Sequence, residues 1–155
     1  DVASVTHSTS LAIYTKNMTS GEVGAGWDVP SCEGNFDTAT YHTVQGLKKT
    51  FTTDSDGVLE ITFSGMGRNS KDYGSIYSAI FVDEQPLTNA FGHEQLGGCR
   101  NDGSTAGHLT WCNMTNIGAT SISAGTHAVE VKVKCDLDAE GWVWNGWMTV
   151  KVHGQ

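Results

Sequence analysis

The sequence lacks the features that mark several protein classes. Only two prolines occur, and charged residues make up 17% of the 155 residues, below the roughly 25% of an average soluble protein. Hydrophobic residues reach 38%, so we expect a folded core rather than a disordered polyelectrolyte. No apolar run approaches the roughly 18 residues that cross a bilayer, and we expect no membrane insertion.

Positive charge is scarce as well. Lys and Arg number 9 against 17 Asp and Glu, which gives a net charge of −8, and no run of basic residues occurs. This balance removes the attraction that nucleic acid or an anionic membrane needs, so neither is an expected partner. The length suits a single domain over residues 1–155. The chain opens at Asp1 without a charged and then apolar leader, and we therefore expect a mature form.

Glycine is abundant, with 19 residues, and together with so little proline it favours many tight turns between short strands. Alternation is clearest at residues 127–134, where Val129, Val131 and Val133 share one face and predict a half-buried strand. The run Ile76–Val82 is apolar on both faces, which indicates the middle of a sheet or a subunit contact. No ten-residue window has a helical period, so the fold is expected to be all-β. Further strands are expected at residues 4–14, 43–52, 59–63, 108–114 and 148–152.

Turn residues separate these strands. Asp54–Gly57 and Ser123–Gly125 each predict a β-hairpin between the runs that flank them. Two longer glycine-rich stretches, Ser20–Gly34 and Phe91–Gly107, are expected to be loops. Because loops carry function more often than strands do, these are places where a binding site could lie.

The cysteine pattern predicts two disulfides. Cys32, Cys99, Cys112 and Cys135 form an even set without any C-x-x-C pair, so the usual zinc and redox spacings are absent. Four cysteines allow three connectivities; because Cys99 and Cys112 flank a short glycine-rich loop, we favour Cys99–Cys112 together with Cys32–Cys135. Disulfides indicate a secreted, extracellular protein. Sequons at Asn17 and Asn113 fit N-glycosylation in the same setting.

Eight or nine antiparallel strands in a disulfide-stapled domain predict a two-sheet β-sandwich, and a jelly roll rather than an immunoglobulin fold because the Cys-Trp-Cys spacing is missing. From about residue 50 onward four strand and turn segments follow one another: DSDGVLEITFSG (54–65), YSAIFVDEQPL (77–87), SAGTHAVEVKV (123–133) and WMTVKV (147–152). In these segments the chain resembles the jelly-roll heads of the complement and tumour necrosis factor superfamily, and secreted invertebrate β-sandwich lectins. The resemblance implies a secreted recognition module that is often trimeric.

The most unusual segment runs from Cys135 to Trp147 and mixes carboxylates with tryptophans. Carboxylate and amide groups hydrogen-bond sugar hydroxyls, and an indole face packs on the apolar face of a galactose-like ring, so the mixture suits carbohydrate binding. The alternative is that the tryptophans fill the core or a subunit interface. Trp142 and Trp144 are two positions apart and can point to the same face of a strand, whereas Trp147, beyond Gly146, is expected to start a new strand. The candidate carbohydrate-binding residues here are Asp136, Asp138, Glu140, Trp142, Trp144, Asn145 and Trp147.

A second candidate site lies in the Phe91–His108 region, where His93, Glu94, Arg100 and Asn101 offer varied donors and acceptors. The alternative is an ordinary polar turn clipped by a disulfide.

Metal binding has little support in the sequence. Asp136, Asp138 and Glu140 alternate like a hard-cation ligand set, with Asp54 and Asp56 as a thinner candidate. However, alternate side chains on an extended strand lie about 7 Å apart, so ordinary surface carboxylates are the alternative. We expect no cofactor, with calcium left open. The six histidines have no metal-ligand spacing, and zinc is not expected.

These patterns predict a lectin. No G-x-S-x-G nucleophile elbow occurs, and nothing pairs a nucleophile with a base, so we expect no enzyme activity. We expect a secreted lectin for galactose-type or N-acetyllactosamine-type glycans, acting as a homo-oligomer because single sugar sites are weak. The alternative from another class is a complement-head-like oligomeric module that binds protein or serves a structural role. An enzyme on the same sandwich would need Asp138 or Glu140 for turnover.

Overall fold

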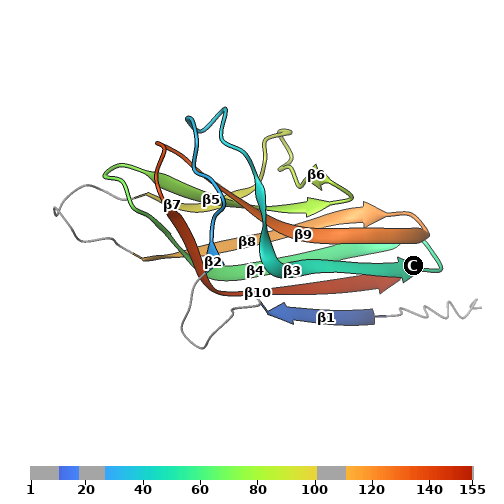
Figure 1. The fold of residues 1–155 in the computed structure, drawn as a ribbon. Helices are drawn as coiled ribbons and strands as arrows, with labels where there is room; N and C mark the ends of the chain where they lie inside the picture. The colour runs from blue at the N-terminus through green and yellow to red at the C-terminus, as the bar shows by residue number, and fades with distance from the viewer. Residues whose placement is uncertain (1–10, 18–26, 101–110, 155) are drawn as a thin grey trace, which may run out of the picture.

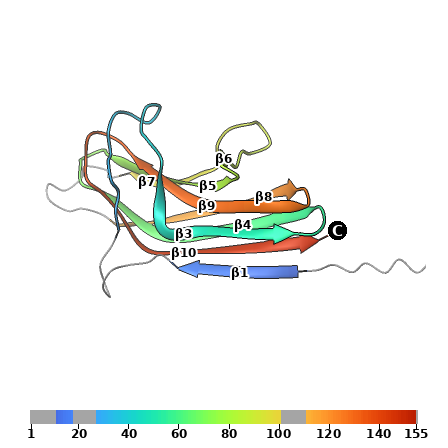
Figure 2. The ribbon, with the colours of Figure 1, turned by 45° about the vertical axis from the view of Figure 1, so that its right-hand side comes forward.

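The computed structural model describes residues 11–17, 27–100 and 111–154, which form two antiparallel β-sheets packed face to face (Figure 1). The first sheet has the order β1 (Leu11–Asn17), β10 (Gly141–Gly154), β4 (Gly57–Asn69) and β8 (Cys112–Ile122), and short β2 (Trp27–Asp28) pairs with the start of β10. The second sheet has the order β3 (His42–Thr53), β9 (Gly125–Cys135) and β5 (Ser75–Val82). Both β6 (Gln85–Pro86) and β7 (Leu96–Arg100) pair with β5. Figures 1 and 2 agree that β1 lies along the outer edge of its sheet, beside β10.

The strand orders 1-10-4-8 and 3-9-5-7 are those of a jelly roll, because from β7 to β10 the chain passes from one sheet to the other at every connection. This confirms the predicted fold class. Within the described residues no helix is long and apolar enough to cross a bilayer.

Both predicted hairpins are wrong. The turn at Asp54–Gly57 joins β3 to β4, and the turn at Ser123–Gly125 joins β8 to β9, and in each case the two strands belong to opposite sheets. The two turns lie together at one end of the sandwich, where Asp56 Oδ1 accepts a hydrogen bond of 2.9 Å from Ala124 N. The local hairpin is instead β5–β6, whose two turn residues Asp83 and Glu84 have φ of 48° and 67°, as a twisted two-residue turn requires.

The core lies between the sheets and follows the predicted alternation. In β4 every second residue from Gly57 to Asn69 is buried, and the segment Ile76–Val82 is buried on both faces apart from half-buried Tyr77. Alternation places one side of each strand against the opposite sheet, so burial of these residues provides the main stabilising term. The fully buried residues include Leu59, Ile61, Phe63, Met114, Val129, Val131, Val133, Met148 and Val150.

The outer face of β9 is less exposed than predicted, because Glu130 and Lys134 are buried. The connection from β2 to β3 brings aromatic rings over this face: Lys134 Nζ lies 4.1 Å from the ring centroid of Phe36 and 4.6 Å from that of Tyr41. Glu130 accepts hydrogen bonds from Lys48 Nζ at 3.0 Å and from a threonine hydroxyl. The predicted half-buried strand is therefore wrong only at Glu130 and Lys134, since Ala128 and Lys132 on the same face remain partly exposed. A covering loop cannot be predicted from a strand pattern.

Both disulfides have the favoured pairing. Cys32–Cys135 ties the segment after β2 to the end of β9, and Cys99–Cys112 ties β7 to the start of β8. Part of the stretch expected to be a loop, Phe91–Gly107, is strand β7. Residues 101–110, and the first part of the strand expected at 4–14, lie outside the described residues.

Candidate functional site

Three tryptophans of β10 share the outer face of the first sheet. The pairing with β4 shifts between Trp144, opposite Met66, and Trp147, opposite Ser64, which inserts one extra residue into β10. This bulge contains Asn145, whose φ is 51°. Trp144 and Trp147 are three positions apart, which in a regular strand would put them on opposite faces, and the extra residue returns Trp147 to the face of Trp144. Trp147 therefore does not start a new strand: it lies on the same face as Trp142 and Trp144, with 40% of its surface exposed.

A fourth tryptophan, Trp111 just before β8, and an arginine of β4 join them. The guanidinium carbon of Arg68, on β4, lies 4.9 Å from the ring centroid of Trp142 and 5.6 Å from that of Trp111. The rings of Trp111 and Trp144 lie 5.7 Å apart at 55°. Within the described residues, Arg68 Nε is buried without a hydrogen-bond partner, and the guanidinium group makes cation–π contacts with these two indoles. We call these residues the tryptophan face: Arg68, Trp111, Trp142, Trp144 and Trp147.

A pocket of about 330 Å³ lies at the β2 side of this face, and we call it the Trp142 pocket. Trp142 supplies an aromatic wall, and Asp28, its partner in the β2–β10 register, supplies a carboxylate. Glu140 supplies a second carboxylate, and Ser31 lines the pocket with a hydroxyl that bonds His42 Nε2 at 3.2 Å. The structure thus brings Glu140 and Trp142 together with Asp28. The full lining is Asp28, Val29, Pro30, Ser31, Ala139, Glu140, Gly141 and Trp142.

The other carboxylates of the Cys135–Trp147 segment face different partners. Asp136 is buried, and its Oδ1 accepts a hydrogen bond of 2.7 Å from Ser75 N. Asp138 is exposed and accepts a bond of 3.2 Å from Gly34 N. Among residues 11–17, 27–100 and 111–154, no three His, Cys, Asp or Glu side chains gather as a metal-ligand group.

The second candidate site is spread over two elements. His93 and Glu94 are exposed before β7, and Glu94 Oε2 accepts a bond of 2.7 Å from the Tyr41 hydroxyl. Burial, with the hydrogen bond and charge of Glu94, raises the pKa of Tyr41. Arg100, at the other end of β7, donates from Nε to Tyr73 O at 3.3 Å. Asn101 lies outside the described residues.

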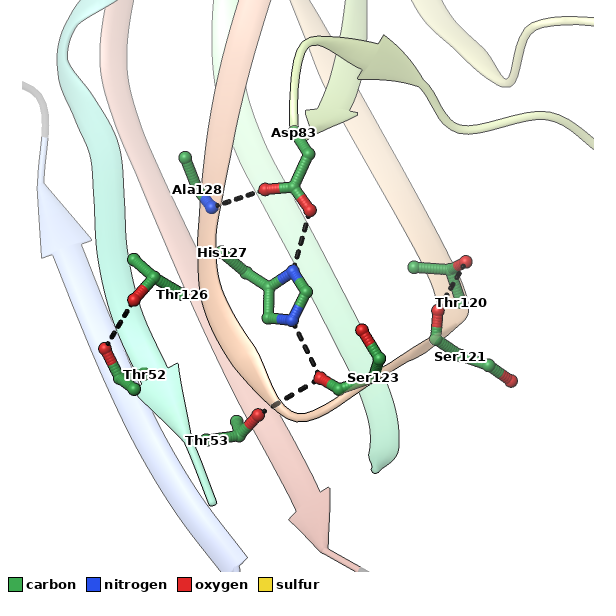
Figure 3. Close-up of polar contacts among 9 residues, drawn as sticks. All are labelled: Thr52, Thr53, Asp83, Thr120, Ser121, Ser123, Thr126, His127 and Ala128. Carbon is green, nitrogen blue, oxygen red and sulfur yellow. Dashed lines mark hydrogen bonds and ion pairs between the residues drawn. The ribbon is translucent and has the colours of Figure 1, made fainter. Parts of the chain in front are cut away.

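At the opposite end of the sandwich, His127 is held by two acceptors (Figure 3). Its Nδ1 lies 2.7 Å from Asp83 Oδ2 and its Nε2 lies 2.9 Å from the carbonyl oxygen of Ser123. Asp83 Oδ1 also accepts a bond of 2.8 Å from Ala128 N. Because both ring nitrogens face acceptors, the protonated ring satisfies both contacts. A polar cavity of about 440 Å³ adjoins this group.

The titration of this pair follows from its contacts. The hydrogen bond to Asp83, then the Ser123 carbonyl, raise the pKa of His127 against a smaller effect of burial. Burial alone would raise the pKa of Asp83, but the hydrogen bonds from His127 and Ala128 outweigh it and the pKa is lowered. A ring nitrogen that donates to a carbonyl has no lone pair for base catalysis. Through the contacts of His127 with Asp83 and Ser123, the group connects the β5–β6 turn to the β8–β9 turn.

Several of these residues were missed from sequence. Asp28 and Arg68 lie far along the chain from Trp142, and sequence proximity carries no signal for them. For Trp111 the signal was its position two residues before Asn113 in the strand expected at 108–114, a spacing that favours the same face of a strand.

Asn113 is exposed on β8, whereas the sequon of Asn17 extends to Thr19, outside the described residues.

Neither a protein-family model nor a curated protein matches the chain. Solved structures do. The infectious bursal disease virus Gx strain structure has a TM-score of 0.59 at 15% identity, over 94% of this chain and 33% of that one. The VP2 subviral particle of infectious bursal disease virus has 0.54 at 13% identity, over 93% and 33%. Dimeric latent PorU from Porphyromonas gingivalis has 0.51 at 8% identity, over 95% and 13%.

These likenesses establish the fold. At such identities they support a jelly-roll-like β-sandwich and nothing finer, so the predicted resemblance is confirmed at that level. The chain spans about a third of the length of the viral chains it matches.

Proposed function

We propose that this protein is a non-catalytic lectin that holds a galactose-type or N-acetyllactosamine-type sugar in the Trp142 pocket. The observation that carries the proposal is the composition of this pocket, which joins one indole to two carboxylates and a hydroxyl. Sugars need an apolar wall for their C–H face and acceptors for their hydroxyl protons, and this pocket has residues of both kinds.

The charges of the pocket favour a neutral sugar. Asp28 and Glu140 would repel a sugar that carries a carboxylate or sulfate, and the chain has a net charge of −8. Arg68 already occupies one face of the Trp142 ring, so the sugar stacks from the other side. Galactose suits this geometry because its axial hydroxyl leaves one ring face apolar.

The proposal includes two further properties: the protein binds the sugar without catalysis, and it acts as an oligomer with several copies of the site. Single shallow sugar sites are weak, so a homo-oligomer would supply avidity. Two disulfides support an extracellular setting. Asp28 and Glu140 both line the pocket; turnover of a galactoside that is lost in Glu140→Gln would make the pocket that of a glycosidase instead.

The test is a glycan array with the purified protein, with and without a calcium chelator, followed by titration of the best ligand. Trp142→Ala is expected to weaken binding at least about tenfold, that is ~1.4 kcal/mol. Trp147→Ala is the matched control, since Trp147 lies on the same face but outside the pocket. Thermal unfolding and circular dichroism check that both variants fold. A blank array, or full binding by folded Trp142→Ala, would overturn the proposal.

One observation favours a second candidate, a complement-head-like oligomeric module that binds protein. Ile13 and Ile117 are 57% and 62% exposed, and strand alternation puts both on the outer face of the first sheet with Trp147. The two isoleucines lie on β1 and β8, at opposite edges of this sheet, where each could contact another copy of the chain. An inert array together with a stable trimer in light scattering would favour this candidate, and the loss of the trimer in Ile117→Lys would locate the interface.

A further inference from the structure

We propose that Asn113 carries an N-linked glycan whose first sugars pack against the indoles of Trp111 and Trp144. The proposal is independent of ligand binding in the Trp142 pocket. It assigns a role to Trp111 and Trp144, two tryptophans of the tryptophan face that do not line that pocket.

The strand geometry puts the whole sequon and one tryptophan on the same surface. Asn113 and Thr115 of β8 are two positions apart, and residues at this spacing point to the same side of a strand. Trp111 lies just before β8, and the contact of its ring with that of Trp144 places it over the same face. Asn113 and Thr115 are exposed, whereas Met114 between them is fully buried in the core. The acceptor amide and the threonine hydroxyl therefore both face solvent, as a sequon must for modification.

The register brings the second tryptophan within reach. Asn113 pairs with Met66 across β8–β4, and Met66 pairs with Trp144 across β4–β10. Asn113 is two residues from Trp111 along the chain. Trp144 lies two strands away from Asn113, and neighbouring strands are about 4.8 Å apart. The two rings, 5.7 Å apart at 55°, offer one continuous aromatic surface beside the attachment point.

The covalent step needs a secretory glycosylation donor. Asn113 Nδ2 forms a bond to C1 of the first N-acetylglucosamine, while the bond between C1 and the phosphate oxygen of a lipid-linked diphosphate oligosaccharide breaks. Nδ2 loses one proton and the diphosphate leaves with the bonding electron pair. Once attached, the C–H face and acetyl methyl of this sugar pack on indole and remove apolar surface from water.

This arrangement also divides the tryptophan face into two parts. The glycan covers the surface around Asn113, Trp111 and Trp144, and the Trp142 pocket opens on the side formed by β2 and the start of β10. A bulky, polar cover over half-buried indoles would limit self-association through this part of the sheet.

The experiment uses the full chain secreted from eukaryotic cells. Mass spectrometry of the peptide containing Asn113, before and after peptide N-glycosidase, measures occupancy. Native enzymatic removal of the glycan is expected to lower the unfolding midpoint by roughly 2–4 °C and to change tryptophan fluorescence. The same removal from Trp111→Ala is expected to have little effect on the midpoint, because the contact is absent. Asn17→Gln is the control for glycosylation elsewhere. We expect this variant to show the same fall in the unfolding midpoint on deglycosylation as the unaltered protein.

Two outcomes overturn the proposal. One is an Asn113 that carries no glycan. The other is a fall in the unfolding midpoint on deglycosylation that is equally large in the unaltered protein and in Trp111→Ala. If Trp111→Ala does not fold, nuclear Overhauser contacts between the N-acetyl methyl and indole protons decide in the unaltered protein. Their absence at an occupied site also overturns it. Binding in the Trp142 pocket is read on the glycan array and does not depend on these results.

Discussion

The clamp at His127 makes the stability of the fold depend on pH, and the sign follows from its contacts. The folded-state pKa of His127 is raised by Asp83 and by the Ser123 carbonyl, so the folded protein holds this proton more tightly than an unfolded chain with a pKa of about 6.5. The stabilisation is fully present below about pH 6.5 and is lost as the pH rises through the raised pKa. The contribution of Asp83, whose pKa is lowered, is lost only as the pH falls below about 3.9 and through that lowered value.

The magnitude follows from burial and bond type. The His127 side chain is 10% exposed but that of Asp83 is 48% exposed, so solvent screens their ion pair to about 1 kcal/mol or less. The second charged hydrogen bond, to the Ser123 carbonyl, brings the total to about 1–2 kcal/mol. Above the raised pKa, one ring nitrogen faces an acceptor without a proton, and that contact becomes unfavourable.

Urea unfolding of the oxidised protein at pH 5.5 and at pH 9 measures this contribution. Asp83→Asn removes the charge that raises the pKa of His127 while keeping a similar shape. We expect this variant to lose about 1–2 kcal/mol relative to the unaltered protein at pH 5.5 and clearly less at pH 9. An NMR titration of the His127 ring gives the folded pKa directly. The reasoning is refuted if the loss is the same at both pH values, or if it is larger at pH 9.

Other predictions concern the cross-links and the tight packing. Removing Cys32–Cys135, with a separation of 103 residues, should cost about 4–5 kcal/mol in urea unfolding. Removing Cys99–Cys112, with a separation of 13, should cost about 3 kcal/mol, and equal losses would contradict the loop-entropy argument. Glu130→Gln should cost about 1–3 kcal/mol at neutral pH, because a buried carboxylate that accepts from Lys48 at 3.0 Å is neutralised; an unchanged melting temperature would contradict this. Gly141→Ala should lower the melting temperature, since the new Cβ would lie 2.7 Å from Cys135 Sγ; a neutral result would show that the disulfide can shift.

The local patterns were reliable where the physics is local. Alternating apolar residues identified the strands, because in a strand every second side chain must face the core. The burial of Ile76–Val82 on both faces of its strand was also predicted, since a strand that is apolar on both faces has no polar face to turn to solvent. The cysteine pairing followed from chain proximity and elimination.

The errors arose wherever a neighbour distant in sequence decides the outcome. The turns at Asp54–Gly57 and Ser123–Gly125 were identified, but a turn does not determine whether the next strand pairs with the previous one or crosses to the other sheet. The bulge at Asn145, which moves Trp147 to the same face as Trp142, depends on pairing with β4.

From the sequence alone the fold class and most of the core strands could be predicted, because these depend on composition and on a period of two residues. The pairing Cys99–Cys112 with Cys32–Cys135 was only the favoured one of three. The tertiary structure alone decided which groups meet around Trp142. Asp28 and Arg68 reach the outer face of β10 through strand pairing, and Asp136 is turned to Ser75 instead. Strand register is set by packing between segments far apart in the chain, and no local pattern encodes it.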